Sequence, residues 1–345
     1  IVLIIISIGL CRGDSFDGIK SIKELNTIME NHFARENTLS AEEFNNRLPS
    51  DNERKYMRQL INILMIQKDL KICTNSSISS LFPVLEGTIS LTPFQDQYCV
   101  IHEPIPSEAY EMFPRTFGYG VIRIPSNDVM NVHHSVAHFE SDGGVTEQSA
   151  TLFESTKSRT LMNNGISRFA IVGNPDSTCQ PGNTAADAAH NTNMMFHTML
   201  QGVYDVSKSR IDDHHIQWHG MAETSCLQSS AFVSLGASGS NSIYNTDNVA
   251  DQIAKSITRT SNGKIIGNTP KGDETCTLVA GTNVFGRQVH GVPEDDVCGT
   301  AATKFDNKFI HIEQKMCARI AFDQWTETLN EIFGKKSIFH DEFKV

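Results

Sequence analysis

The chain has 345 residues, of which 39% are hydrophobic and 20% are charged, and its 29 Lys and Arg against 40 Asp and Glu give a formal net charge of −11. These values describe a globular protein with one sizeable core and exclude a disordered chain, a collagen-like repeat or a coiled coil. The basic residues are spread along an acidic chain without forming a stripe. This argues against nucleic acid as a partner and favours a small molecule or a peptide.

The first ten residues form an apolar run, IVLIIISIGL, that is too short to span a bilayer and gives way at once to polar residues. Such a run is typical of the apolar part of a signal peptide, so we predict that residues 1–13 are a signal-peptide remnant and that the mature protein is secreted. A buried strand rich in β-branched residues would give the same pattern. Because no later run is long enough for a membrane helix, we expect no membrane association after signal removal.

Residues 14–84 have a helical pattern. Apolar residues recur at helical spacing over 56–65, and Ser40 followed by Glu43 is a start signal for a helix. We therefore predict a small helical N-terminal region, which is a candidate for a removable pro-segment. Asn75, in the sequence Asn-Ser-Ser, is a predicted N-glycosylation site.

The main region is predicted to span 85–345, where short apolar runs divided by Gly, Pro and Asn alternate with helical stretches. This order is typical of a wound α/β sheet, in one large domain or as the second of two. The predicted strands are 120–124, 130–136, 159–162, 214–219 and 309–313. The predicted helices are 147–157, 187–204, 249–258 and 319–333. Strand 130–136, helix 147–157 and strand 159–162 would form a β-α-β unit.

The eight Cys residues include no C-x-x-C pair, which argues against a zinc ribbon or a thioredoxin-type site. Disulfides suit a secreted chain. If Cys11 leaves with the signal peptide, seven Cys residues remain, and sequence proximity favours three pairs and leaves Cys317 as a buried thiol. The predicted pairs are Cys73–Cys99, Cys179–Cys226 and Cys276–Cys298.

Three places that follow or end predicted strands carry polar residues suited to chemistry. In wound α/β folds, functional groups collect in loops at the carboxyl ends of strands. The first place is the His-rich and acidic segment 133–147, the second is His219 with Gly220, and the third is Glu313. Imidazoles and carboxylates are common zinc ligands, although a single strand-end His more often has a structural role.

The order of these groups resembles the zinc carboxypeptidase-like hydrolases, and more narrowly the N-formylglutamate amidohydrolase and poly-γ-glutamate hydrolase branch, over residues 118–333. The segment from Glu313 to Arg319 is similar to the Glu-x5-Arg segment of that branch. The resemblance implies a three-layer, wound mixed sheet of the phosphorylase/hydrolase-like kind, with Zn²⁺ as the cofactor.

The resemblance also implies roles for single residues. His138 would be the first zinc ligand, Asp142 or Glu147 the carboxylate ligand, His219 the third ligand and Glu313 the catalytic base. The H-x-x-E spacing of the carboxypeptidases is absent, so two acidic residues compete for one role. We favour Asp142 because two Gly residues follow it and let the loop fold back, whereas Glu147 has an alternative role as a capping acid at a helix start.

The same branch implies a substrate that bears a carboxylate, which needs cationic or amide partners. Arg168 and Arg287 are candidates, as is Arg319 from the similar segment. His190 is a further candidate because the predicted helix that begins at Asp187 would place it at the site, although Asp187 fits equally well as a helix cap.

These observations favour a secreted zinc-dependent hydrolase that cleaves an amide or peptide bond next to a carboxylate. A catalytically inactive, secreted binding protein of the same fold is the alternative from another class. A serine or cysteine hydrolase is a third possibility, although the segment 236–240 lacks the final Gly of a Gly-x-Ser-x-Gly nucleophile elbow.

Overall fold

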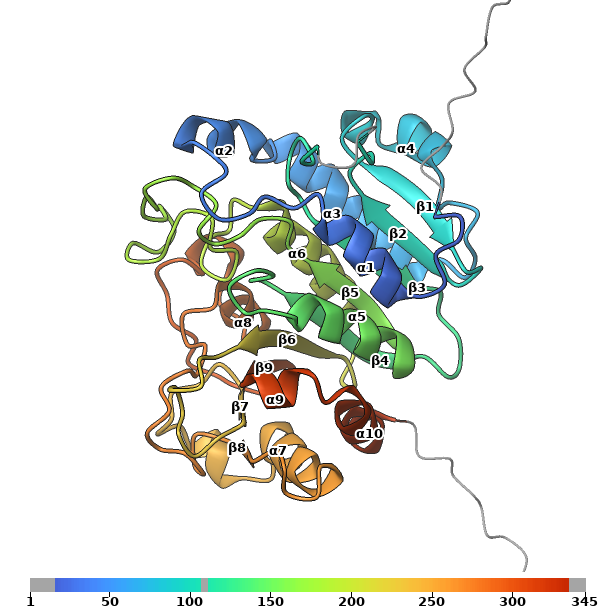
Figure 1. Ribbon diagram of the computed structural model, residues 1–345. Coiled ribbons are helices and arrows are strands. Elements are labelled where there is room, and N and C mark those ends of the chain that lie inside the picture. Colours follow the sequence, from blue (N-terminus) through green and yellow to red (C-terminus); the bar gives the residue numbers. More distant parts are fainter. Residues whose placement is uncertain (1–15, 107–110, 335–345) are drawn as a thin grey trace, which may run out of the picture.

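A computed structural model describes residues 16–106 and 111–334, so the apolar start of the chain and Cys11 lie outside the described residues. Within the described part, nine strands form one mixed sheet in the order β1-β2-β3-β5-β4-β6-β9-β7-β8 (Figure 1). The strands are β1 (Ser90–Phe94), β2 (Tyr98–His102), β3 (Tyr119–Arg123), β4 (Met130–Val136), β5 (Ser158–Asn163), β6 (His214–Gly220), β7 (Ala231–Ser234), β8 (Gly267–Asn268) and β9 (Phe309–Gln314). The four central strands β5, β4, β6 and β9 are parallel.

Helices flank this sheet (Figure 1). They are α1 (Ile22–Glu30), α2 (Ala41–Arg47), α3 (Asp51–Ile66), α4 (Asn75–Leu81), α5 (Val145–Ser155), α6 (Met195–Ser207), α7 (Val249–Thr260), α8 (Val284–Val289), α9 (Met316–Arg319) and α10 (Phe322–Phe333). Successive strand residues point to opposite faces of a sheet. On β2, Tyr98 and Val100 join a core with α1 and α5, whereas Cys99 and Ile101 join a core with α3 and α6. Apolar cores therefore form on both faces of the sheet.

The N-terminal region is helical, as predicted, and α2 begins after Ser40 with the expected capping box to Glu43. The apolar stripe of α3 is buried against α6, and Met57, Leu60 and Ile61 are fully buried there. Helix α3 thus completes the core on one face of the sheet. The structure does not test whether residues 14–84 are cleaved off as a pro-segment.

The five predicted strands correspond to β3, β4, β5, β6 and β9, and the β-α-β unit is present as β4, α5 and β5. The predicted helix over 187–204 begins only at Met195. Asp187 and Asn191 accept hydrogen bonds from backbone N–H groups two residues further on, at 3.0 and 2.9 Å. Such local bonds compete with a helix, so residues 187–194 form turns instead.

The disulfides differ from the predicted pairs. Cys73–Cys99 is confirmed, but Cys179 pairs with Cys298 and Cys226 pairs with Cys276. Sequence proximity predicted the wrong partners because the loop before α6, which carries Cys179, lies against the loop before β9, which carries Cys298. The two Cys residues are 119 positions apart in the sequence. Cys317 is free and exposed, so its prediction as a buried thiol was wrong.

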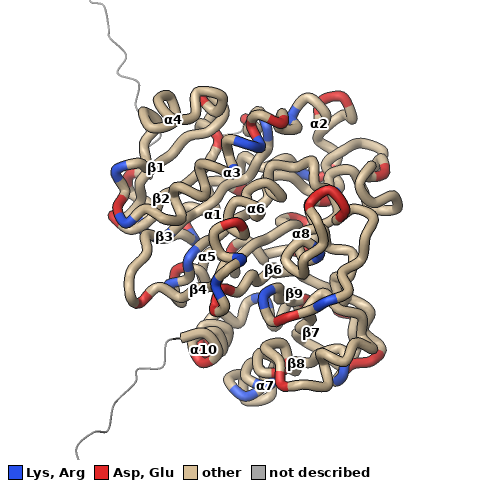
Figure 2. The backbone as a smooth tube through the Cα atoms, turned by 180° about the vertical axis from the view of Figure 1, so that it is seen from behind, with Lys and Arg blue, Asp and Glu red and all other residues tan. Residues whose placement is uncertain are grey.

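Three disulfides indicate an oxidising environment. No helix in the described ranges is long and apolar enough to cross a membrane. Lys and Arg are interspersed with Asp and Glu over the molecule (Figure 2). Asn75 is exposed at the start of α4, and its glycosylation stays a prediction.

We expect the double substitution Cys179→Ser and Cys298→Ser to lower the free energy of unfolding by about 2–5 kcal/mol, because this disulfide closes a loop with a sequence separation of 119. Urea unfolding measures the loss. Cys317→Ser is the matched control and should change stability by less than about 0.5 kcal/mol, since that thiol is exposed and unpaired. A non-reducing peptide map that joined Cys179 to Cys226 would contradict the pairing.

Candidate metal centre

A pocket of about 390 Å³ opens at the carboxyl ends of β4, β6 and β9. Its polar lining comes from segments far apart in the sequence, and the loop 277–283 forms its remaining wall. The titratable side chains that line the pocket are His138, Arg168, His190, His219, His311 and Glu313. The pocket therefore gathers residues from all three places that the sequence analysis singled out.

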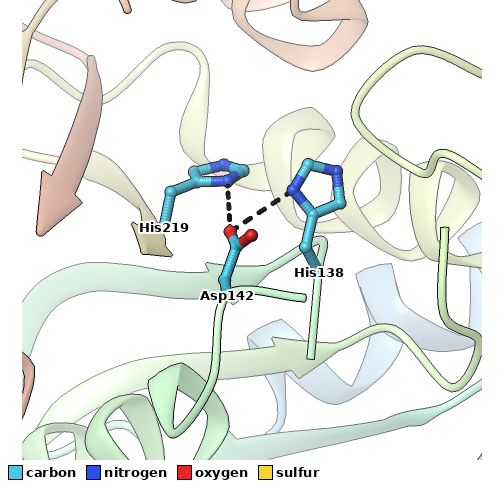
Figure 3. A group of neighbouring side chains, drawn as sticks. All are labelled: His138, Asp142 and His219. Carbon is cyan, nitrogen blue, oxygen red and sulfur yellow. Dashed lines mark hydrogen bonds and ion pairs between the residues drawn. The ribbon is translucent and has the colours of Figure 1, made fainter. Parts of the chain in front are cut away.

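Three side chains converge on one point (Figure 3). Oδ2 of Asp142 lies 3.4 Å from Nδ1 of His138 and 3.0 Å from Nδ1 of His219. All three residues are buried, and their ligand atoms lie within 4.8 Å of one another. Of the two acidic candidates for a metal ligand, Asp142 is the one that the structure brings to the histidines.

The local backbone explains this convergence. Asp142 sits in a turn after β4 that Gly143 and Gly144 continue with positive φ angles of 43° and 76°, conformations that glycine adopts readily. Across the sheet, a Cβ atom on Gly220 would lie 2.3 Å from the backbone oxygen of Asp142. A glycine after His219 is thus required because the turn after β4 packs directly on the end of β6.

The outward-facing atoms of the three candidate ligands are also held. Nε2 of His138 donates to Oδ1 of Asp187 at 2.9 Å, and Nε2 of His219 donates to Oε1 of Gln217 at 2.9 Å. Arg168 donates to Oδ1 of Asp142 at 2.7 Å. Outer partners of this kind orient the imidazoles of metal sites and leave Nδ1 of each ring for the metal.

The electrostatics of this cluster favour positive charge. Burial opposes a charged imidazole at His138, but the carboxylates of Asp187 and Asp142 outweigh it and raise the pKa of His138 to about 9. Burial likewise opposes ionisation of Asp142, but the neighbouring His138 and His219 hold its pKa well below the usual value. A metal cation would take the place of the imidazolium proton, because metal binding releases protons from its ligands.

Glu313 lies beside the cluster on β9, where it is the register partner of His219 on β6. Its side chain is 12% exposed and faces the pocket. Burial, followed by the negative charge of Asp142, raises the pKa of Glu313 to about 8. Glu313 is thus a proton-exchanging group at neutral pH.

His311 belongs to the site although the sequence analysis did not name it. Its ring lies 4.6 Å from that of His219, and its Nε2 lies 3.5 Å from Oε1 of Glu313. The signal was the period of two along β9, because residues two apart on a strand share a face. Oγ of Ser234 lies 3.4 Å from the other ring nitrogen of His311, Nδ1, so that Ser234, His311 and Glu313 are arranged like a serine triad. Ser234 is fully buried, however, and cannot contact a substrate.

Three predicted residues, Glu147, Arg287 and Arg319, neither line the pocket nor belong to the cluster of His138, Asp142 and His219. Glu147, in the first turn of α5, is half-exposed and pairs with Lys23 at 2.5 Å. Arg287 donates to the backbone oxygens of Val297 and Cys298 at 2.8 and 3.0 Å. Its guanidinium therefore braces the loop before β9.

Arg319 has a similar bracing role. It donates to the backbone oxygens of Asp142 and Gly143, and no ion pair joins it to Glu313 in the described residues. Its effect on the pocket is to hold the turn that carries Asp142. Arg168 and His190 are the predicted substrate-binding residues that do line the pocket.

We expect Asp187→Asn to weaken zinc binding roughly 10–100-fold, because the neutral amide is a poorer acceptor for the Nε2–H of His138 and lowers the basicity of that ring. Competition with a chromogenic chelator measures the affinity. Asp176→Asn, an exposed acid in the same loop, is the matched control and should leave the affinity unchanged. Equal affinities for the two variants would contradict this role of Asp187.

Comparison with known proteins gives little further information. No protein-family model matches the sequence, and no curated protein matches it either. Among solved structures, the crystal structure of N-formylglutamate amidohydrolase from Ralstonia eutropha JMP134 overlaps with 60% of this chain and 93% of its own, with 8% sequence identity and a TM-score of 0.33. An overlap at that TM-score gives no information about the function of this protein.

Proposed function

We propose that this protein is a zinc-dependent hydrolase that cleaves an amide or peptide bond next to a carboxylate. The observation that carries the proposal is the convergence of two imidazole nitrogens on the buried carboxylate of Asp142, at the wall of a pocket that His138, His219 and Glu313 line. Three protein ligands with an adjacent open space are typical of catalytic zinc sites, whereas structural sites use four. The finer fold assignment, a three-layer carboxypeptidase-like sheet, belongs to the same proposal.

The donor set fits zinc. Nδ1 of His138 is buried and faces Oδ2 of Asp142 at 3.4 Å without forming a hydrogen bond. A metal ion held by both groups would satisfy this nitrogen. His138, Asp142 and His219 would hold the metal. The chemistry that zinc supplies when bound is a polarised substrate carbonyl and a water molecule whose pKa is lowered to about 7.

Glu313 supplies the proton transfer. It lines the pocket beside the candidate ligands, close enough to accept the proton of an attacking water and to pass it to the leaving amine. A nearby divalent cation favours the ionised carboxylate and so lowers the pKa of Glu313 from the raised value it has in the metal-free pocket. Glu313 then accepts a proton as the base before it acts as the acid.

Arg168 is the residue that we assign to the substrate carboxylate. Among the described residues that line the pocket it is the one Lys or Arg, and its side chain is 28% exposed. It already contacts Asp142 at 2.7 Å, and Asp187 at 3.9 Å. A substrate carboxylate would therefore share a guanidinium that also holds the metal ligand, which couples substrate binding to the metal site.

We also propose that the protein is secreted. The support is its three disulfides, which persist in oxidising compartments, together with the apolar run at the start of the sequence.

Metal analysis combined with a substrate panel tests the proposed function. We expect one equivalent of zinc per chain, hydrolysis of at least one member of a panel of N-formyl and N-acetyl amino acids and short peptides, loss of that activity with a zinc chelator and recovery on adding zinc. Protein that binds no zinc, or activity that persists without it, would overturn the proposal. Stoichiometric zinc without turnover of any panel member would favour a binding protein that keeps the same site.

A further inference from the structure

The orientation of the pocket residue His190 is set by a hydrogen-bond network outside the metal cluster. It lies in the turns before α6, and its Nδ1 is 2.7 Å from Oε1 of Gln180. In the described part of the chain its other nitrogen, Nε2, makes no hydrogen bond, and the ring lines the same pocket as His219 and Glu313. One ring nitrogen is thus held while the other is left for a ligand.

The amide orientation of Gln180 follows from its neighbours. Its Nε2 donates to the backbone oxygens of Thr282 at 2.8 Å and Cys298 at 3.2 Å. A flipped amide would place its oxygen against two carbonyl oxygens, so the flipped form is excluded. Oε1 of Gln180 therefore faces His190 and accepts a hydrogen bond from its Nδ1–H.

This hydrogen bond fixes the tautomer of His190. A neutral imidazole carries one proton, and when that proton is on Nδ1 the lone pair is on Nε2. Burial lowers the pKa of His190, which keeps the ring neutral at pH 7. His190 thus presents a hydrogen-bond acceptor to the pocket.

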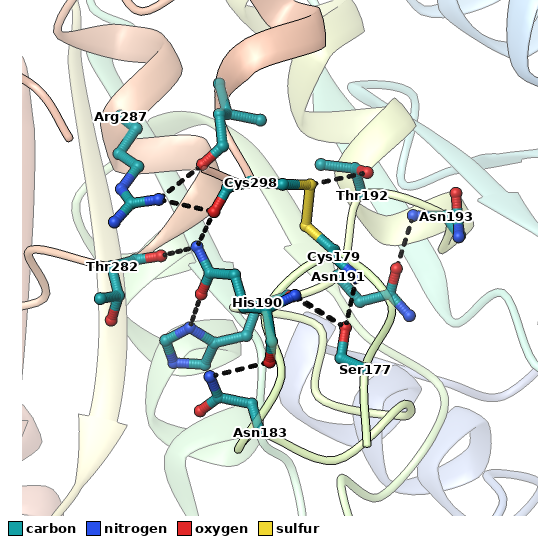
Figure 4. Close-up of a disulfide and its surroundings, with 12 residues drawn as sticks. Ser177, Cys179, Asn183, His190, Asn191, Thr192, Asn193, Thr282, Arg287 and Cys298 are labelled. Carbon is teal, nitrogen blue, oxygen red and sulfur yellow. Dashed lines mark hydrogen bonds between the residues drawn. A yellow bond between two sulfur atoms is a disulfide. The ribbon is translucent and has the colours of Figure 1, made fainter. Parts of the chain in front are cut away.

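The network around Gln180 is rigid. Gln180 is 7% exposed and follows Cys179, which is joined to Cys298 by a disulfide (Figure 4). Ser177 Oγ donates to the backbone oxygen of His190 at 3.3 Å, and Arg287 donates to that of Cys298 at 3.0 Å. The acceptor on His190 is therefore held in place before a ligand arrives.

We propose that Nε2 of His190 accepts a hydrogen bond from the N–H of a secondary-amide substrate, and that Gln180 is the positioning residue that fixes His190 for this role. The inference rests on the proposed function, because an amide presents one carbonyl oxygen and one N–H. The metal site would bind the carbonyl oxygen, and Nε2 of His190 would accept the hydrogen bond of the N–H. The site then selects secondary amides over tertiary amides, since a tertiary amide has no N–H to donate.

Histidine-selective NMR of the zinc-loaded protein tests the tautomer without any turnover. The ring signals that disappear in His190→Asn identify His190, and we expect its Nε2 to have the ¹⁵N shift of an unprotonated nitrogen. Gln180→Leu removes the acceptor and should release the ring toward the Nε2–H form. A protonated Nε2 in the wild-type protein would overturn the assignment.

A matched pair of probes tests the contact itself. N-Acetylglycine has an amide N–H next to a carboxylate, and N-acetylsarcosine is its N-methyl counterpart. We expect N-acetylglycine to move the Nε2 signal of His190 and to bind at least roughly tenfold more tightly, the effect of one hydrogen bond to a fixed acceptor. His190→Leu should remove this preference while zinc content stays unchanged.

The outcomes separate the inference from the proposed function. Equal binding of the two probes by the wild-type protein, a preference that survives in His190→Leu, or no shift with either probe would overturn the role of His190, whatever the zinc content and activity show. Absence of zinc or of hydrolysis would instead overturn the proposed function.

Discussion

His219→Ala is expected to abolish stoichiometric zinc binding and, with it, hydrolysis. Nδ1 of His219 lies 3.0 Å from Oδ2 of Asp142 and is one of three candidate ligand atoms. Zinc bound by four ligands in zinc-finger peptides is held by about 10–16 kcal/mol, so one ligand accounts for about 3–4 kcal/mol, or roughly 10²–10³-fold in affinity. Elemental analysis after dialysis against a weak chelator measures the retained metal.

The control lies at the other end of the same strand. His214 begins β6, and its Nδ1 contacts the backbone oxygen of Asn307, far from the pocket. His214→Ala should retain a full equivalent of zinc, while circular dichroism should show that both variants are folded. If His219→Ala kept full zinc occupancy, the assignment of His219 as a ligand would be wrong.

The two acidic candidates are separated in the same assay. Asp142→Ala removes the carboxylate that both histidines face and should lose the metal as His219→Ala does. Glu147→Ala removes only a half-exposed ion pair to Lys23, a type of contact worth about 0–1 kcal/mol, and should leave zinc unchanged. A loss of zinc in Glu147→Ala alone would reverse the assignment.

The strands that carry the site could be predicted from the sequence because their patterns are local. On β9, for example, Ile310 and Ile312 alternate with polar residues, and such an alternation with a period of two predicts a strand. A polar residue at the end of such a strand then points to the carboxyl edge of the sheet. His219, Glu313 and the segment that contains His138 were found in this way, whereas the choice of His138 and the roles of all three residues came from the family resemblance. The structure brings the three residues to one pocket.

The roles of the arginines could not be predicted from the sequence. A cation near a pocket suggests an anionic substrate. Arg287 and Arg319 instead both donate hydrogen bonds to backbone carbonyl groups in loops. Buried carbonyls must be satisfied, and which side chain satisfies them depends on how distant loops meet. The same long-range contacts decide that Cys179 pairs with Cys298 instead of a nearer Cys.

Local hydrogen bonds of polar side chains prevent the helix that the sequence pattern predicts from beginning at Asp187. The residues from Asp187 to Asn193 continue the helical spacing of α6, but Asp187 and Asn191 bond to the backbone ahead of them and keep this segment in turns. The turns place Asp187 on His138 and leave His190 at the pocket wall.

Glu313→Gln is expected to lower kcat by at least roughly 10²-fold while zinc content stays at one equivalent. Glutamine keeps the shape of the side chain but cannot accept the proton of an attacking water. The zinc ligands are His138, Asp142 and His219 in our assignment, so their donor atoms are untouched by the change. Turnover of the best panel substrate, measured beside metal content, provides the test.

Folding should survive this substitution. Burial raises the pKa of Glu313 to about 8 in the metal-free pocket, so the carboxyl group there is mostly protonated at pH 7 and a neutral amide is a close mimic of it. The described residues show no ion pair between Glu313 and Arg319 that the amide would break. We therefore expect a thermal midpoint for metal-free Glu313→Gln that equals or exceeds that of the metal-free wild-type protein.

Glu223→Gln is the matched control, because Glu223 accepts a hydrogen bond from the backbone N–H of Met316 close to the end of β9 and lies outside the pocket. An amide oxygen can keep that hydrogen bond, so its kcat should stay within about twofold of the wild-type value. A near-normal kcat with normal zinc in Glu313→Gln would remove Glu313 from the mechanism. Loss of folding in that variant would show that the carboxylate is needed for structure, because the shape of the side chain is conserved and only one ionisable oxygen is replaced by an NH2 group.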